Sequence, residues 1–178
     1  MYPFIRFFWQ LHKHRNDPKL GFLDTHISEH YCMPWDIDFW MELNNGRTLT
    51  LFDLGRIPLG RRTGLFDALK RRGWGLTVAG STVRYRRRVR AFDKVTMRSR
   101  CIGFDERFCY LEQAMFHKNG ECANHVIIRS AVTSKSGIVP SSEVAAEMGI
   151  TGKMPELPDW IKTWIEAEAN RPWPPMQD

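Results

Sequence analysis

The chain has 178 residues, 43% of them hydrophobic, a formal net charge of +6 and an isoelectric point near 9.4. This length and ordinary composition suit one folded domain and exclude a largely disordered chain. The positive charge favours polyanionic partners, namely nucleic acid, acidic lipid or a phosphate-rich small ligand, and charge alone does not choose among them. No stretch reaches the roughly 20 apolar residues that a membrane-spanning helix needs.

The N-terminal segment MYPFIRFFWQLHKHRN places an aromatic cluster before a basic one. It lacks the charge-first order and the cleavage site of a secretory signal. We favour a helix or strand that packs onto the domain or onto a partner subunit. Peripheral contact of residues 1–15 with a membrane surface is the alternative.

The four cysteines are Cys32, Cys101, Cys109 and Cys122, and they show neither a C-x-x-C pair nor zinc-ligand spacing. Free thiols in apolar surroundings behave as small hydrophobic groups, which predicts a reducing, cytoplasmic environment. His26 and His30 lie in a predicted strand within residues 22–33, and no Glu or Cys there completes a ligand set. We therefore expect structural or surface histidines, and neither a metal nor a cofactor.

A helix is predicted to begin at Asn44 or Asn45, because Asn side chains accept hydrogen bonds from the first helix amides. Pro58 should end or kink this helix, since proline has no amide hydrogen. A second helical piece covers residues 65–72 and ends at Gly73 after a basic last turn. The central helix is thus either one bent element or two.

From Trp74 onward the pattern changes to the two-residue period of strands. Strands are expected over residues 76–89, 94–104, 108–117 and 123–134, with an Asn-Gly turn before the last. Beyond Pro140, Ser141-Ser142-Glu143 caps a short helix that runs through Met148, and Asp159 caps another with an apolar stripe. One helical region followed by an antiparallel meander predicts an α+β fold, with the sheet wrapped around the helix.

Arginines dominate the segment from Arg84 to Arg90. On a strand, Arg84, Arg86 and Arg88 project to one side, together with Arg90. Arginine forks suit phosphate groups, so this face could bind a nucleotide or follow a nucleic-acid backbone. A solvated strand face, or salt bridges across a dimer, would explain the cluster equally well.

Three acidic residues, Asp36, Asp38 and Glu42, precede the predicted helix. The free amides and the positive dipole end of a helix N-terminus stabilise negative charge. A carboxylate beside such a terminus suits acyl chemistry, whereas acidic residues in this position are also common as helix caps.

The run D-x-D-x-x-M-E-L-N-N from Asp36 to Asn45 resembles the D-x-D-x-x-G-H-V-N-N signature of hotdog-fold acyl-CoA thioesterases. The resemblance is nearest to the branch of 4-hydroxybenzoyl-CoA thioesterase. It continues through Asp53 and Arg56 to about Pro140, and it departs where Met41 replaces Gly and Glu42 replaces His. The resemblance implies a single hotdog domain over residues 1–178, with a core of about 22–140, an N-terminal extension of 1–21 and a C-terminal helical extension of 141–178.

By the same resemblance, the chain is expected to hydrolyse an acyl-CoA thioester without a cofactor, as a homodimer or dimer of dimers. Asp38 would act as general base or as nucleophile, and the amides of Asn45 and Gly46 would stabilise the oxyanion. Glu42 would be a second carboxylate, an ion-pair partner or a cap. Asp53 would be an alternative base or an ion-pair partner of Arg56. The coenzyme A phosphates would bind Arg84, Arg86 and Arg88.

Two other functions stay open from the sequence. A non-catalytic acyl-CoA-binding protein would keep the fold and the basic segment, and Glu42 in place of His supports it. A nucleic-acid-binding protein would explain the arginines but would leave the Asp and Asn motif without a role. We expect no nucleic acid partner.

Overall fold

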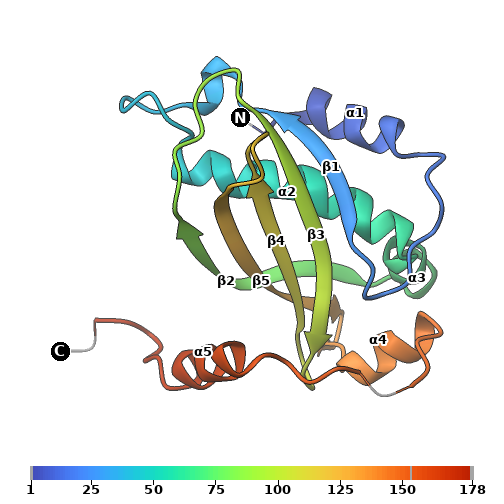
Figure 1. Cartoon of the computed structure of the whole chain (residues 1–178). Coiled ribbons are helices and arrows are strands. Elements are labelled where there is room, and N and C mark those ends of the chain that lie inside the picture. Colours follow the sequence, from blue (N-terminus) through green and yellow to red (C-terminus); the bar gives the residue numbers. More distant parts are fainter. Residues whose placement is uncertain (1, 153, 177–178) are drawn as a thin grey trace.

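An antiparallel sheet curls around one long helix in the computed structural model of the chain, which describes residues 2–152 and 154–176 (Figure 1). The strands are β1 (His26–Tyr31), β2 (Gly75–Tyr85), β3 (Lys94–Phe104), β4 (Cys109–Phe116), β5 (Cys122–Ser134) and β6 (Gly137–Ile138). They lie in the order β1-β3-β4-β5-β2, and β6 pairs with β5. The helices are α1 (Phe4–Lys13), α2 (Asn45–Arg62), α3 (Leu65–Arg72), α4 (Ser141–Glu147) and α5 (Asp159–Ala169), with a short 3-10 turn at Pro34–Asp36. The predicted α+β fold is confirmed.

The main core lies between α2 and the concave face of the sheet. Leu51, Phe52 and Leu54 of the helix are almost completely buried, and they share one cluster with Met97 of β3 and Met115 of β4. Burying each such side chain contributes about 2 kcal/mol, so this contact fixes the helix against the strands. Its consequence for function is that the N-terminal end of α2 is held at one place on the sheet.

The central helix begins where the sequence predicts, with Asn44 as N-cap. It does not end at Pro58, however, but continues to Arg62, so of the two outcomes predicted at the proline, an end or a kink, the end is wrong. Pro58 is buried in the helix–sheet contact, where packing offsets the missing hydrogen bond. The chain leaves the helical path at Gly64 instead, whose φ of +80° is a left-handed conformation that favours glycine. Helix α3 then ends at Gly73 as predicted.

The strand predictions hold for β3, β4 and β5 within one residue at each end, but the strand predicted over residues 76–89 stops at Tyr85. Arg86 and Arg87 both donate their amides to the carbonyl of Ala123, at 2.9 and 3.1 Å, which breaks the alternation of a strand. The prediction that Arg84, Arg86, Arg88 and Arg90 share one strand face is therefore wrong. Only Arg84 and Tyr85 lie in the strand, and the other arginines follow it.

The extensions pack on two sides of the sheet. Helix α1 lies along the edge strand β1 and is tied to it by hydrogen bonds from Gln10 and Arg6 to backbone carbonyls. Helix α5 lies across the convex face, where Ile161 packs against Tyr110 and Ile127. The expected caps at Ser141–Ser142 and Asp159 lie inside the first turns, because Pro140 and Pro158 occupy the cap positions.

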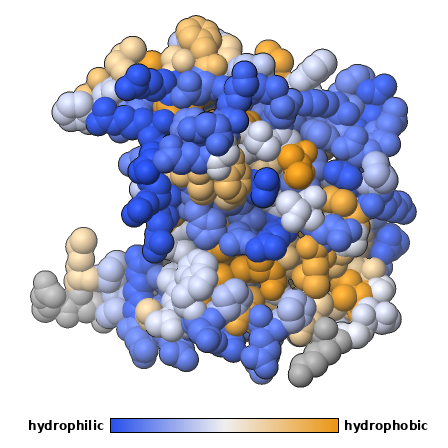
Figure 2. Space-filling model, viewed as in Figure 1, coloured by the Kyte–Doolittle hydropathy of each residue, from blue (hydrophilic) through white to orange (hydrophobic). Residues whose placement is uncertain are grey.

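Several large apolar side chains stay exposed near one end of the molecule, and hydrophobic groups are visible along the top of Figure 2. Among them are Ile5 of α1 and Phe39 in the loop before α2. Of the helices in the described residues, none is long and apolar enough to cross a membrane.

Gly55 provides a test of the helix–sheet contact. An added Cβ would lie 2.3 Å from Met97 Sδ and 3.0 Å from Ser99 Oγ. We expect Gly55→Ala to lower the free energy of unfolding by about 1–3 kcal/mol through overpacking, measured by urea denaturation. At an open helical position the same change would stabilise by up to about 1 kcal/mol.

Gly46→Ala is the matched control, because the added Cβ would meet only the Asn44 side chain, at 3.3 Å. An unchanged or increased stability of Gly55→Ala would show that α2 does not approach β3 as closely as described.

Candidate functional site at the N-terminal end of the central helix

The loop that leads into α2 is fixed by the buried carboxylate of Asp36. Its Oδ2 accepts hydrogen bonds from Arg6 at 2.5 Å and from the Met33 amide at 3.0 Å. Its Oδ1 accepts two from Arg47, at 3.0 and 2.7 Å. The carbonyl of Asp36 accepts the Asn44 amide at 2.9 Å. This one residue joins α1, the end of β1 and the start of α2.

Burial opposes ionisation of Asp36, but hydrogen bonds from the Met33 amide and from the Arg47 and Arg6 guanidinium groups outweigh it. Together they hold the pKa of the carboxyl below its usual value. Asp36 is therefore the anionic centre of a structural ion-pair network, and its oxygens point at the protein rather than at an open site.

The first helix amides of α2 are divided between the cap and the solvent. The Asn44 side chain accepts from the amides of Gly46 at 2.9 Å and Arg47 at 3.2 Å. Among the described residues, nothing accepts the amide of Asn45, an exposed residue in the first position of the helix. Of the two predicted oxyanion donors, Asn45 is thus open, whereas Gly46 already has an acceptor.

Asp38 lies in a tight turn just before the helix. Its Oδ1 accepts the Trp40 amide at 2.8 Å, and its own amide donates to the Glu42 carbonyl at 2.8 Å. Met41 has a φ of +60° in this turn, a left-handed conformation that glycine adopts without strain. This explains physically why glycine suits the position that Met41 occupies. In the described part of the chain, no cationic side chain pairs with the Asp38 carboxylate.

A polar pocket of about 210 Å³ opens beside this turn. It forms because the Leu43 amide donates to the Val89 carbonyl at 2.8 Å, which draws the segment after β2 alongside the loop before α2. Its lining residues are Glu42, Leu43, Asn45, Tyr85, Arg86, Arg87, Arg88, Val89 and Asn124.

The charges of the pocket are only partly compensated. Arg88 pairs with Glu42 at 2.9 Å, and Arg87 pairs with Glu121. In the part of the chain that the structure describes, no carboxylate pairs with the Arg86 guanidinium. The pocket therefore presents one uncompensated cation close to the positive end of a helix, an arrangement that favours an anionic ligand.

The structure thus brings together four of the predicted site residues, Glu42, Asn45, Arg86 and Arg88. Gly46 and Asp38 are adjacent to them along the chain but do not line the described pocket. Arg84 does not line it either, although its neighbour Tyr85 in β2 does.

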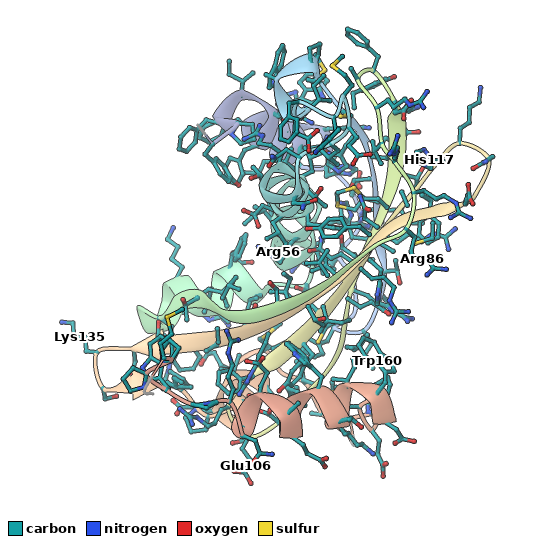
Figure 3. All side chains as sticks on the ribbon, turned by 90° about the vertical axis from the view of Figure 1, so that its left-hand side faces the viewer. Arg56, Arg86, Glu106, His117, Lys135 and Trp160 are labelled. Atoms are coloured by element: carbon teal, nitrogen blue, oxygen red, sulfur yellow. The ribbon has the colours of Figure 1, made fainter. Side chains whose placement is uncertain are left out.

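Asp53 lies further along α2 and pairs with Arg56. Burial raises the pKa of Asp53, and Arg56 opposes that rise. Figure 3 shows Arg56 and Arg86 well apart, so the Asp53–Arg56 pair is not part of the pocket.

Five lining residues of the pocket were not predicted as site residues, namely Leu43, Tyr85, Arg87, Val89 and Asn124. In a regular strand, Arg87 would lie on the opposite face from Arg86 and Arg88. Because the strand ends at Tyr85, this alternation does not apply to Arg87. Asn124 comes from β5, and no local pattern in the sequence relates it to residues near 42. Only the pairing of β5 with β2, in which Asn124 lies opposite Tyr85, brings it to the site.

His26 lies close to other possible metal ligands in space, but His30 is not one of them. His14, Asp17 and His26 place possible ligand atoms within 4.8 Å of one another. The Arg62 guanidinium already lies among them, 2.9 Å from His26 Nδ1 and 3.5 Å from Asp17 Oδ2. Burial, with His14 and Arg62, lowers the pKa of His26 to about 4. Since Arg62 supplies the cation of this cluster, we assign the cluster a structural role.

A curled antiparallel sheet around a central helix is the hotdog-like architecture, and solved structures share it. The probable thioesterase YbaW from Escherichia coli superposes with a TM-score of 0.65 at 16% identity, over 72% of this chain and 99% of that one. The DHNA-CoA thioesterase from Staphylococcus aureus gives 0.60 at 15% identity, over 82% and 91%.

Sequence comparison defines the family. The profile of the thioesterase-like superfamily matches residues 32–165. Protein THEM6 from Xenopus laevis is 30% identical over 145 residues, which cover 81% of this chain and 69% of that protein. Protein THEM6 from Drosophila melanogaster is 29% identical over 147 residues, covering 81% and 74%. The chain belongs to the thioesterase-like superfamily.

Asp36→Asn tests the ion-pair network. The substitution keeps the shape but leaves two partly buried guanidinium groups without their anion, so we expect a loss of about 3 kcal/mol of unfolding free energy at pH 7. Because the folded-state pKa of Asp36 is lowered, its contribution is present above the unfolded value of about 3.9 and is lost as pH falls through the folded value. The difference between wild type and variant should therefore shrink below about pH 4.

Glu106→Gln, at an exposed position, is the control and should change stability by less than about 0.5 kcal/mol. A difference between wild type and Asp36→Asn that is the same at pH 3 and pH 7 would contradict the ionic account.

Proposed function

We propose that this protein is an acyl-CoA thioesterase that hydrolyses a thioester to a free acid and coenzyme A. The observation that carries the proposal is the polar pocket, which joins the open N-terminal amide of α2 to Arg86 and Arg88. The helix end suits the developing oxyanion, and the arginines suit the phosphates of coenzyme A. Membership of the thioesterase-like superfamily supports the reaction class, and so does a structural neighbour solved in complex with CoA, with a TM-score of 0.58 at 9% identity.

In this mechanism the thioester carbonyl oxygen accepts the Asn45 amide. The oxygen gains negative charge as the carbonyl carbon becomes tetrahedral, and the helix dipole stabilises that charge. Asp38 either removes a proton from the attacking water or attacks the carbonyl carbon itself to give an anhydride that water then opens. In both routes the tetrahedral intermediate collapses with cleavage of the C–S bond, and the departing coenzyme A thiolate takes up a proton. Glu42 holds Arg88 at the pocket through its ion pair. In this role Glu42 positions a binding residue and need not replace a histidine.

Asp38→Asn is the direct test of this assignment. The amide has nearly the same shape but is neither a base nor a competent nucleophile, so turnover should fall roughly a hundredfold or more. Thiol release from acyl-CoA measures the turnover, and thermal unfolding reports whether the variant is folded. Asp36→Asn is the parallel variant and should act mainly on stability. A folded Asp38→Asn protein with wild-type turnover would remove Asp38 from the mechanism.

The assignment of a phosphate-binding role to Arg86 can be tested against Arg84, which lies in the same arginine-rich segment. Arg86→Ala should raise KM for acyl-CoA about tenfold, because it removes a charged hydrogen bond to phosphate, and should leave kcat nearly unchanged. The effect should weaken at high salt. Arg84→Ala is the matched control, since Arg84 does not line the pocket. Equal effects of both substitutions would indicate a general charge effect instead of a phosphate contact.

We also propose a homodimer with the site near its interface. Strand β2 has 11 residues at the edge of the sheet, and its Leu76 and Val78 are 40% and 51% exposed. Long apolar edges readily pair with another strand. Light scattering should show a dimer for wild type and a shift toward monomer for Val78→Lys, but not for Leu23→Lys at an exposed loop. A wild-type monomer with full activity would contradict this proposal.

Non-catalytic binding of acyl-CoA is the second candidate, and one observation favours it: the Asp38 carboxylate caps the Trp40 amide and does not line the pocket. Binding of acyl-CoA without thiol release would identify this function.

Two finer proposals accompany the main one. The Asp36-to-Asn45 motif favours the branch of 4-hydroxybenzoyl-CoA thioesterase, and the four free cysteines favour a cytoplasmic location.

A further inference from the structure

A second, quite different cavity lies at the other end of α2. It has a volume of about 80 Å³ and is partly enclosed. Its walls come from the C-terminal half of α2, from α3, from the concave face of β3, β4 and β5, and from the segment that contains β6 and α4. The lining is mostly apolar, with Leu59, Phe66 and Leu111 among its side chains.

A cavity of this size is large by the standards of protein interiors. About 10–15 Å³ accommodates one water molecule, and water enters only where several polar groups can bind it. Apolar cavities stay dry, and each missing contact costs dispersion energy that a hydrocarbon ligand would restore. The cavity is therefore suited to an apolar group and poorly suited to water.

One wall of the cavity is formed by the short helix α4 and the residue that follows it. Helix α4 contributes Val144, Ala145 and Met148 to the lining. It is held to α3 by ion pairs of Arg71 with Glu147 and of Arg72 with Glu143, at 2.8 and 2.7 Å. Both arginines are about half exposed, and exposed ion pairs of this kind contribute little. Val144 also packs against the buried cluster of Leu69, Val132 and Val139, so entry of a chain-like ligand from the surface would require α4 to move away from that cluster.

Two arginines also line the cavity, and they differ in one respect. Arg56 already pairs with Asp53 and donates to Gln113 Oε1 at 3.2 Å. Arg107 lies over the Phe108 ring, and among the described residues no carboxylate pairs with its guanidinium. The neighbouring Asp105 carboxylate accepts instead from Tyr110 and from backbone amides. A free cation thus lies at the edge of an apolar cavity.

We propose that this cavity binds a free fatty acid, with the hydrocarbon chain between α2, α4 and the sheet and the carboxylate paired with Arg107. Apolar volume alone would accept any hydrocarbon, and the uncompensated guanidinium selects an amphipathic anion. The apolar lining suits an unbranched chain, whose methylene groups replace the missing contacts one by one.

This site is separate from the polar pocket. From Asn45 to Leu59 the helix rises about 21 Å, at 1.5 Å per residue. Figure 3 agrees, since Arg86 of the polar pocket lies at about mid-height, well above Glu106 at the lower end, whose carbonyl accepts the Ser141 amide at 3.0 Å. The two pockets share no lining residue. The proposal therefore does not depend on whether the chain hydrolyses thioesters.

Isothermal titration calorimetry of the full chain with hexanoate, octanoate and decanoate tests the proposal. We expect saturable binding that tightens about fourfold per added methylene until the cavity is full. Ala145→Phe, which fills the cavity from α4, should weaken decanoate binding at least tenfold. Ala146→Phe is the matched control, because Ala146 is exposed on the same helix and does not line the cavity. Thermal unfolding confirms that both variants fold.

The head group is tested with Arg107→Gln. This change should weaken decanoate binding about tenfold and leave the binding of decan-1-ol unchanged, since only the acid carries a charge. Free coenzyme A, which would occupy the polar pocket, should not displace decanoate. Absence of saturable decanoate binding, equal losses in Ala145→Phe and Ala146→Phe, equal effects of Arg107→Gln on acid and alcohol, or displacement by coenzyme A would each overturn the proposal.

Discussion

The buried carboxylate of Asp36 is the constraint on which the site depends. It accepts from the guanidinium groups of Arg6 and Arg47 and from a backbone amide, while its carbonyl holds the amide of Asn44. These contacts fix the path of the loop between β1 and α2, together with the hydrogen bond from the Leu43 amide to the Val89 carbonyl. The cap at Asn44, the open amide of Asn45 and the turn that contains Asp38 all follow from it. The N-terminal helix α1 thereby contributes to the site without touching it, through Arg6.

The central helix then connects two regions with opposite chemistry. Its N-terminal end faces a polar, cationic pocket, and its C-terminal half faces an apolar cavity closed by α4. Between them, Gln113 ties the helix to the sheet: its Nε2 donates to the Phe52 carbonyl and to Ser99 Oγ, both at 2.8 Å. Satisfied buried polar groups of this kind specify one arrangement of helix and strands. Both regions are thus held by the same helix–sheet contact.

Much of this was predictable where the physical cause is local. The N-cap Asn44, the glycine cap at Gly73 and the strands β3, β4 and β5 follow from short-range hydrogen bonding and a two-residue period. The end predicted at Pro58 was wrong because tertiary packing decides whether a helix tolerates a proline, and the local sequence does not reveal that packing. The arginine segment misled because a single carbonyl, that of Ala123 on another strand, ends β2 at Tyr85. Arg6 and Asn124 were missed because only the fold brings them to the site.

The most direct test of the central claim compares two thioesters of the same acyl group across a panel of acyl chains. One is the acyl-CoA, and the other is its N-acetylcysteamine analogue, which lacks the nucleotide; the release of free thiol is measured for both. If the pocket at the start of α2 binds coenzyme A and promotes hydrolysis, at least one acyl-CoA is turned over. Its analogue then shows a similar kcat and a KM raised at least about tenfold, because the phosphate contacts are gone. Folded protein that releases no thiol from any acyl-CoA, or that has equal KM values for both thioesters, would contradict the account.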